Sequence, residues 1–246
     1  MDTHTLLNSL KAQKKSQLVK KLWKVVRLKP LAISVTKRKA LDYQSTLKLL
    51  KKKYPDAHCA LHFKNPFQLL IATILSAQCT DERVNIVTKV LFAKYKKPSD
   101  LACEKVEIIE EIIRSTGFYK NKAKNIKACC QILEEKYNNQ VPQQLEQLVA
   151  LPGVGRKTAH VVLGNAYGIA SGVVVDTHVT RLSNRFGWIK TEDAVKIESH
   201  LNKKFESQEW VMLSHYLIAH GRALCKARSP SCETCFLASS CPRKGL

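Results

Sequence analysis

The chain has 246 residues, 45% hydrophobic and 25% charged, which is an ordinary balance for a globular protein with a substantial core. Its 41 Lys and Arg residues against 20 Asp and Glu residues give a net charge of +21 and a pI near 9.7, which indicates a polyanionic partner. A membrane partner is disfavoured, because no lipidation motif is present and no apolar run approaches the roughly 20 residues of a membrane span.

The positive charge is concentrated near the N-terminus. Residues 1–40 contain eleven Lys and Arg residues and a single acidic residue, Asp2, so they carry +10 of the total charge. This segment lacks the apolar region and cleavage site of a secretory signal, and it is rich in Lys where transit peptides are rich in Arg and Ser. We predict a flexible basic arm, helical in part, that contacts phosphates; a dispensable solvated tail is the alternative.

Helical patterns dominate the rest of the chain. A first helix is expected to begin at Ser45 or Thr46 and to stop before Pro55. Further helices are expected over residues 66–77, 82–95, 106–116, 122–137, 141–151 and 156–167, the last of them capped by Gly168. Residues 173–175 resemble a strand without a partner strand, so we expect an extended linker before Asp176 caps the next helix. The sequence therefore predicts an all-α protein of nine to eleven helices.

The segment Leu-Pro-Gly-Val-Gly-Arg-Lys at residues 151–157 joins two of these helices. Gly153 and Gly155 have no side chain, so their backbone N–H groups can approach a ligand closely. N–H groups that converge at a helix N-terminus form an anion site, and in a basic protein the obvious anion is a DNA phosphate. Arg156 and Lys157 open the second helix, so the segment predicts a phosphate site with a reactive amine beside it.

The nine cysteines fall into two groups. Without a signal peptide they argue against a disulfide framework. Five of them are scattered through apolar patterns and are expected to be small core residues: Cys59, Cys79, Cys103, Cys129 and Cys130.

The other four cysteines, Cys225, Cys232, Cys235 and Cys241, have the spacing C-x6-C-x2-C-x5-C. Four thiolates in a short loop-rich segment suit either a tetrahedral zinc ion or an iron–sulfur cluster. Zinc sites more often pair two C-x2-C units, so the spacing favours a cluster without excluding zinc. Lys226 and Arg228 lie between the first two cysteines. We therefore predict a cationic, DNA-binding surface whose loop the metal holds in place.

Several of these motifs occur together in one known family. The chain resembles endonuclease III, the bifunctional DNA glycosylase of the helix-hairpin-helix superfamily, over about residues 45–246. The matching segments are Leu-Ser-Ala-Gln-Cys-Thr-Asp at 75–81, Gly-Phe-Tyr at 117–119, the hairpin at 151–157, Val-Asp-Thr-His at 175–178, and the four-cysteine tail. They follow the order that the family shows, which makes the combination far more specific than any single motif.

The resemblance implies a fold, a cofactor and a domain organisation. It implies a [4Fe–4S] cluster on the four cysteines and a helix-hairpin-helix glycosylase fold of two helical domains with DNA bound between them. Residues 59–170 would form a six-helix barrel domain that contains the hairpin. Residues 41–58 together with 171–246 would form the cluster domain, which leaves residues 1–40 as the basic arm.

The resemblance also assigns roles to individual residues. Lys157 matches the family's catalytic lysine and Asp176 its catalytic aspartate, although a phosphate contact and a plain helix cap are the simpler alternatives. A lysine nucleophile must be neutral, and we expect burial and the positive end of its own helix to lower its pKa. Gln78 would fill the gap left by a flipped base, and Phe118 would be an apolar wedge where the family commonly has leucine. A backbone-bonded polar residue and a core aromatic are the respective alternatives.

The implied activity is base excision repair. The enzyme would remove oxidised pyrimidines from damaged double-stranded DNA and cleave the abasic site by β-elimination through a Lys157 Schiff base. Adenine- or thymine-mismatch glycosylases of the same superfamily and a non-catalytic iron–sulfur DNA-binding protein are the alternatives. The adenine branch generally lacks the lysine and carries a further C-terminal domain, whereas this sequence ends five residues after Cys241. We further expect a monomer in the bacterial cytoplasm, associated with the nucleoid.

Overall fold

All regular secondary structure in the described part of the chain is helical. The computed structural model describes residues 38–246, and within this range the all-α prediction is confirmed by eleven α-helices, two short 3₁₀ helices and no strand. The helices are α2 (Tyr43–Lys53), α3 (Pro66–Leu75), α4 (Asp81–Lys94), α5 (Pro98–Cys103), α6 (Val106–Ile113), η1 (Arg114–Thr116), α7 (Tyr119–Tyr137), α8 (Leu145–Val149), α9 (Arg156–Tyr167), α10 (Thr177–Arg185), α11 (Ala194–Asn202), η2 (Ser207–Glu209) and α12 (Trp210–Ala223). The predicted basic arm lies outside the described residues, except for residues 38–40.

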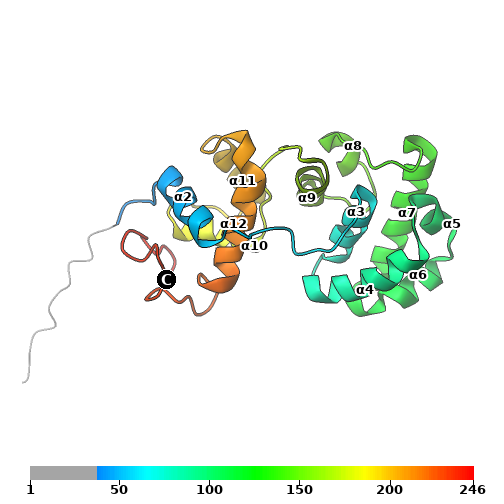
Figure 1. Ribbon diagram of the computed structural model, residues 1–246, viewed down its shortest axis with the longest axis horizontal. Helices are drawn as coiled ribbons and strands as arrows, with labels where there is room; N and C mark the ends of the chain where they lie inside the picture. The colour runs from blue at the N-terminus through cyan, green and yellow to red at the C-terminus, as the bar shows by residue number, and fades with distance from the viewer. Residues whose placement is uncertain (1–37) are drawn as a thin grey trace, which may run out of the picture. The chain divides into compact units, whose positions relative to one another are not determined.

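The helices pack around two hydrophobic clusters. Helices α3 to α9 enclose the first cluster, whose buried residues lie between Leu61 and Leu163. The second cluster combines α2 with α10, α11, α12 and the C-terminal segment, so residues from both ends of the described chain share one core. Figure 1 shows α2 beside α12, although the whole first cluster separates them in sequence. Both clusters belong to one compact unit, Lys39–Leu246, and the predicted domain boundaries stay a prediction.

The helix starts follow local capping chemistry. Helix α2 begins earlier than expected, because Asp42 rather than Ser45 or Thr46 is its N-cap and accepts the backbone N–H of Ser45 at 2.8 Å. Asn65 caps α3 in the same way and places Pro66 at the first helical position. Helix α9 has the predicted bounds, and Gly168 ends it with φ +68°.

Short helices were the main errors of the sequence-based assignment. Helix α8 begins at Leu145 rather than at residue 141, and α5 was not expected. A helix of 5 or 6 residues holds too few turns for a periodic apolar pattern, so its packing decides its bounds. Residues 173–175 form neither a helix nor a strand, and the backbone N–H groups of Val173 and Val174 donate to the side chains of Asn202 and Ser214. In the part of the chain with described coordinates, no helix has the length and apolarity to span a bilayer.

The five scattered cysteines do not all lie in the core. Cys129 and Cys130 are completely buried on α7, and burial raises the pKa of Cys129 to about 12. Cys59 and Cys79 are half-buried at the edge of the first cluster. Cys103 is exposed at the end of α5, so the prediction of a core position was wrong there, because this residue lies on the outer face of a helix only 6 residues long.

Candidate active site and metal centre

The hairpin between α8 and α9 is held by two buried apolar residues. Leu151 and Val154 point into the first cluster, and the backbone N–H of Val154 donates to the carbonyl of Leu151 at 3.1 Å. Gly153 has φ +76°, and a Cβ added there would lie 2.9 Å from Cβ of Asn125 on α7. Both the backbone conformation and the lack of space therefore require glycine at this position.

Gly155 meets a different requirement. Its φ of −87° suits any residue, and a Cβ added there would meet nothing within 4 Å. Gly155 is the N-cap of α9, and within the described residues no side chain caps this helix. No side chain therefore occupies the N–H groups of the first turn of α9, and the anion site expected there stays a prediction.

Lys157 and Asp176 line the same two adjoining cavities. One cavity is also lined by Asn165, His215 and Asp81, and the other by Thr180 and Lys244. The fold thus brings together the two residues that the resemblance named as catalytic. The expected burial of Lys157 is wrong, because the side chain is exposed in the second position of α9.

Asp176 is fixed by the helix that it caps. Its Oδ1 accepts the backbone N–H groups of His178 and Val179, both at 2.8 Å, at the start of α10. Both hydrogen bonds go to one oxygen, so the cap leaves half of the carboxylate for other chemistry. Asp176 is therefore a helix cap in the free protein, as the simpler alternative predicted. Capping leaves its second oxygen free, so it does not exclude a catalytic role.

The first of these cavities lies where the two hydrophobic clusters meet. Asp81 at the start of α4 forms an ion pair with Arg222 on α12 at 2.6 Å. Helix α4 packs in the first cluster and α12 in the second, so this ion pair joins the two clusters at the cavity. His215 on α12 bonds Asn165 on α9 at 2.8 Å in the same way. Burial lowers the pKa of His215, and the neighbouring His58 lowers it further, so this imidazole is neutral near pH 7.

Gln78 and Phe118 share an unusual backbone conformation. Gln78 has φ +55° and Phe118 has φ +48°, in the left-handed region that residues other than glycine seldom adopt. Both side chains are exposed, and Phe118 keeps 64% of its surface accessible. A core role for Phe118 is therefore wrong. Strain at two exposed, non-glycine positions is typical of sites that serve a ligand rather than the fold.

The three predicted cationic contacts differ in their surroundings. The guanidinium of Arg156 donates two hydrogen bonds to the buried carboxylate of Glu198, at 2.8 and 2.7 Å, so this residue is already ion-paired. Lys226 and Arg228 are exposed on the loop that follows Cys225. These two are open to a phosphate, whereas Arg156 would have to share its charge with Glu198.

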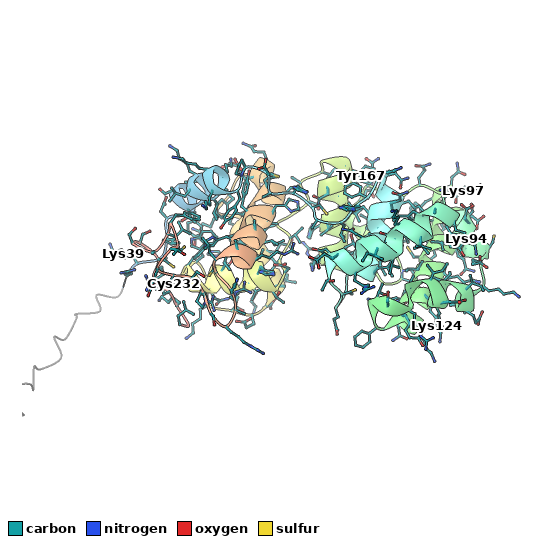
Figure 2. All side chains as sticks on the ribbon, turned by 60° about the horizontal axis from the view of Figure 1, so that its bottom comes forward. Lys39, Lys94, Lys97, Lys124, Tyr167 and Cys232 are labelled. Atoms are coloured by element: carbon teal, nitrogen blue, oxygen red, sulfur yellow. The ribbon has the colours of Figure 1, made fainter. Side chains whose placement is uncertain are left out.

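The four tail cysteines line one cavity. Cys225, Cys232, Cys235 and Cys241 surround it together with Arg185 and His220. Within residues 38–246, no three Cys, His, Asp or Glu side chains are arranged around a single metal ion. A mononuclear zinc site needs thiolates about 2.3 Å from one point. A cubane cluster instead holds its thiolates at separate corners, so four cysteines that share a cavity without converging fit [4Fe–4S] better than zinc. Cys232, labelled in Figure 2, lies on this C-terminal segment.

Other groups donate toward the cysteines. Arg185 is only 7% exposed, and its Nη1 lies 3.4 Å from Sγ of Cys225. The same guanidinium donates to the carbonyls of Lys226 and Ala227, at 2.6 and 2.7 Å. The backbone N–H of Leu237 points at Sγ of Cys235 at 3.5 Å. Such donors stabilise the negative charge of cluster-bound thiolates, which supports the assignment.

Sequence reasoning missed Lys122, Glu198, Arg185 and His215. Each is a charged or polar side chain with at least one partner more than 30 residues away along the chain. No local pattern signals such contacts. The one available hint was a polar residue at a position where the helical period expects an apolar one, and it applies to Lys122, Arg185 and Glu198.

Comparison with known proteins agrees with the fold and with an iron–sulfur cofactor. The family model described as "HhH-GPD superfamily base excision DNA repair protein" matches residues 71–207, and "Iron-sulfur binding domain of endonuclease III" matches residues 225–241. The fold and the site thus define a helix-hairpin-helix DNA repair protein. The chain belongs to the endonuclease III family. It is a base excision repair DNA glycosylase/AP lyase that carries a [4Fe–4S] cluster.

Individual relatives support this placement. Endonuclease III of Synechocystis is 53% identical over 196 residues, which cover 80% of this chain and 90% of the relative. The Bacillus subtilis enzyme is 47% identical over 189 residues, which cover 76% of this chain and 86% of that enzyme. A solved structure of a trapped endonuclease III–DNA covalent intermediate is 47% identical, with a TM-score of 0.78 over 80% of this chain and 93% of that one. A thermostable thymine-DNA glycosylase at 21% identity shares the fold alone, with a TM-score of 0.72 over 80% and 94%.

Proposed function

We propose that Lys157 and Asp176 are the catalytic pair with which this enzyme removes oxidised pyrimidines from duplex DNA and cleaves the resulting abasic site. The observation that carries this proposal is that both residues line the same two cavities, beside the open N-terminus of α9. The covalent intermediate trapped between a related endonuclease III and DNA supports it further, because a covalent bond needs a nucleophile in the site.

Lys157 is the nucleophile. Its neutral amine forms a bond to C1′ of the flipped nucleotide while the bond from C1′ to the base breaks, and the base leaves with the electron pair and takes up a proton. Opening of the sugar ring gives a protonated Schiff base on Lys157. Because the side chain is exposed in the free protein, the DNA that closes over it would exclude water from the amine.

Asp176 acts on the charge that develops during this reaction. As the base departs, positive charge builds on the sugar, and a fixed carboxylate stabilises it. The two backbone N–H groups that hold Oδ1 keep the carboxylate oriented before the substrate arrives. The same carboxylate can help to move the C2′ proton, whose loss allows the bond to the 3′ phosphate to break. This is the β-elimination step of the lyase activity.

The remaining site residues bind and distort the DNA. Gly153 and Gly155 present the backbone N–H groups of the hairpin to a phosphate, with Arg156 contributing while paired to Glu198. Gln78 fills the gap that the flipped nucleotide leaves, and Phe118 wedges between neighbouring bases. Lys226 and Arg228 bind phosphates at the cluster loop. The [4Fe–4S] cluster, held by the four tail cysteines, braces this loop without a part in the chemical steps.

The proposal also covers the domain organisation, the oligomeric state and the location of the enzyme. The two hydrophobic clusters would correspond to two domains, residues 59–170 and residues 41–58 with 171–246. The enzyme would act as a monomer. It would work in the cytoplasm, at the bacterial nucleoid; no disulfide joins the cysteines of the described residues, which suits a reducing compartment.

Borohydride trapping tests the catalytic assignment. Borohydride reduces a Schiff base to a stable amine, so the wild-type protein should form a covalent adduct with duplex DNA that contains an oxidised pyrimidine, and Lys157→Ala should form none. Lys244 lines one of the cavities that Lys157 lines, so Lys244→Ala is a matched control and should form the adduct normally. Absence of the adduct in the wild type would refute the lyase. A higher rate on a mismatched thymine or adenine than on the oxidised pyrimidine would favour the mismatch alternatives.

A further inference from the structure

Lys122 is a buried lysine in the first turns of α7. Its side chain is only 6% exposed, and the ammonium Nζ donates to the backbone carbonyls of Leu75 and Thr116, both at 2.8 Å. Lys124, two residues later on the same helix, is exposed and lies at the edge of the protein in Figure 2. The burial of Lys122 is therefore specific to its position and not a property of this lysine-rich helix.

The two carbonyls end two separate helices. Leu75 is the last residue of α3, and Thr116 is the last residue of η1. Carbonyls at helix C-termini have no partner within the helix and carry partial negative charge, so a cation is a suitable donor for them. Since one nitrogen reaches both, the two carbonyl oxygens can be no farther apart than twice 2.8 Å.

Each of these carbonyls lies two or three residues before one of the strained residues. Gln78 follows Leu75 by three positions, and Phe118 follows Thr116 by two. Lys122 also contacts the second segment through its backbone, because its N–H donates to the carbonyl of Phe118 at 3.1 Å. One residue thus joins the bases of the loops that carry Gln78 and Phe118, two exposed side chains whose backbone is left-handed.

Burying the ammonium group of Lys122 to bond two carbonyls has a large desolvation cost. Burial lowers the pKa of Lys122, and the nearby Cys79 thiol opposes this shift. Water or a neutral side chain could satisfy a helix end at a smaller desolvation cost. What lysine adds is a single charged nitrogen with several donors, able to hold two chain segments at one separation.

We propose that Lys122 is a positioning residue that sets the separation of the Gln78 loop and the Phe118 loop, so that both side chains enter the DNA together. This rests on the proposed function of the enzyme and on the roles of Gln78 and Phe118 in it. Lys122 itself touches neither the DNA nor the reacting atoms. Its loss would weaken nucleotide flipping while leaving Lys157 and Asp176 intact.

The first test compares two substrates. One duplex carries the oxidised pyrimidine opposite a base, and the other carries it in a one-nucleotide bulge, which is unpaired before the enzyme binds. Because flipping a paired base costs a few kcal/mol, Lys122→Met should lose roughly 10- to 100-fold in kcat/KM on the paired lesion and much less on the bulge. A merely structural role would lower both equally. Lys127→Met is the matched control, because Lys127 on α7 also donates to a carbonyl, that of Glu104 at 2.7 Å, away from both loops.

A second variant covers the case in which Lys122→Met does not fold. Lys122→Arg keeps the charge and can still bond both carbonyls, but its planar guanidinium holds them at a different separation. It should remain folded and still lose activity selectively on the paired lesion. Equal losses on the two substrates, or no loss in a folded variant, would overturn the proposal.

A double-mutant cycle shows whether Lys122 acts through the loops. In a protein that already carries Gln78→Ala and Phe118→Ala, adding the Lys122 substitution should cause little further loss on the paired lesion, because the side chains that it positions are gone. Additive losses would contradict the proposal. Borohydride trapping by the wild type separates this result from a failure of the proposed function: no adduct in the wild type refutes the enzyme itself, whereas a normal adduct with additive losses refutes only the role of Lys122.

Discussion

Arg156 holds the carboxylate of Glu198 by two hydrogen bonds, of 2.8 and 2.7 Å, and this pair joins the first residue of α9 to α11. The residue after Arg156 is Lys157, so the ion pair fixes the helix start that carries the proposed nucleophile. His160 lies one turn further along α9, with its Nε2 3.2 Å from Oε1 of Glu198. There is no space for a larger neighbour, because a Cβ on Gly172 would lie 2.8 Å from Oε1 of Glu198.

Glu198→Gln should therefore destabilise the protein. The glutamine amide has no charge and only one oxygen to accept from the guanidinium, so we expect a loss of about 1–3 kcal/mol in the free energy of unfolding. Urea unfolding measures this loss. Lys196→Ala serves as the control, because the ion pair of Lys196 with Asp193 is exposed and 3.8 Å long and should contribute less than about 0.5 kcal/mol. Equal losses in the free energy of unfolding for the two substitutions would show that the buried pair stabilises the protein no more than an exposed one.

His160 should make stability depend on pH. Burial lowers its pKa from the ordinary value of 6.5, and the attraction of Glu198 offsets this only in part. The unfolded chain binds a proton below pH 6.5 while the folded protein does not, so stability is full above that pH and falls as the pH drops toward the folded pKa. His160→Gln should flatten the dependence of the unfolding free energy on pH between about 7 and 5. An unchanged slope would contradict the assignment.

Phe118 should show a trade between stability and activity. Its backbone is left-handed and its ring is 64% exposed, so the phenyl group adds strain without much burial. Asparagine tolerates this conformation, and Phe118→Asn should leave stability unchanged or raise it by up to about 1 kcal/mol. Activity on a paired lesion should nevertheless fall roughly 10-fold or more, because the wedge is lost.

Phe118→Leu is the matched control for this pair of measurements. Leucine keeps an apolar wedge, so activity should stay within about threefold of the wild type. Thermal unfolding gives the stability and kcat/KM gives the activity. A variant Phe118→Asn that kept full activity on the paired lesion would exclude Phe118 from base flipping.

Arg185 should be required for stable retention of the iron–sulfur cluster. Its guanidinium organises the loop after Cys225 through the carbonyls of Lys226 and Ala227. Arg185→Met would leave these groups without their donor, so we expect a lower iron content per chain and weaker visible absorbance of the cluster. Lys226→Ala should retain the iron, because Lys226 offers Arg185 its backbone and not its side chain. Full iron content in Arg185→Met would refute this role.

The cluster loop should contribute to DNA affinity through charge. Lys226 and Arg228 are exposed, so Lys226→Ala and Arg228→Ala should each reduce the slope of log K against log salt by about 0.9. Lys94→Ala is the control: its side chain pairs with Glu104 at 3.0 Å and lies far from Cys232 in Figure 2. If all three variants had the same slope as the wild type, the cluster loop would not contact phosphates.

Much of the site could be predicted because it depends on short-range chemistry. The glycines of the hairpin, the capping carboxylate of Asp176 and the bounds of α9 follow from residues within a few positions of one another. The expectation for α2 was wrong by only a few residues, since Asp42, Ser45 and Thr46 all have side chains that can cap. The exposure of Lys157 could not be predicted in this way, because it depends on how α9 packs against the rest of the chain.

The sequence by itself determined the all-α class and predicted the hairpin, the four cluster cysteines and the proposed catalytic pair, because each belongs to a short motif of neighbouring residues. The tertiary structure alone decided that Arg156 is engaged by Glu198, that Phe118 is exposed and strained, and that Lys122 joins the Gln78 and Phe118 loops. The physical reason is the same in each case. Buried charges and strained backbones are stable only when partners from distant parts of the chain compensate for their cost, and local sequence does not specify those partners.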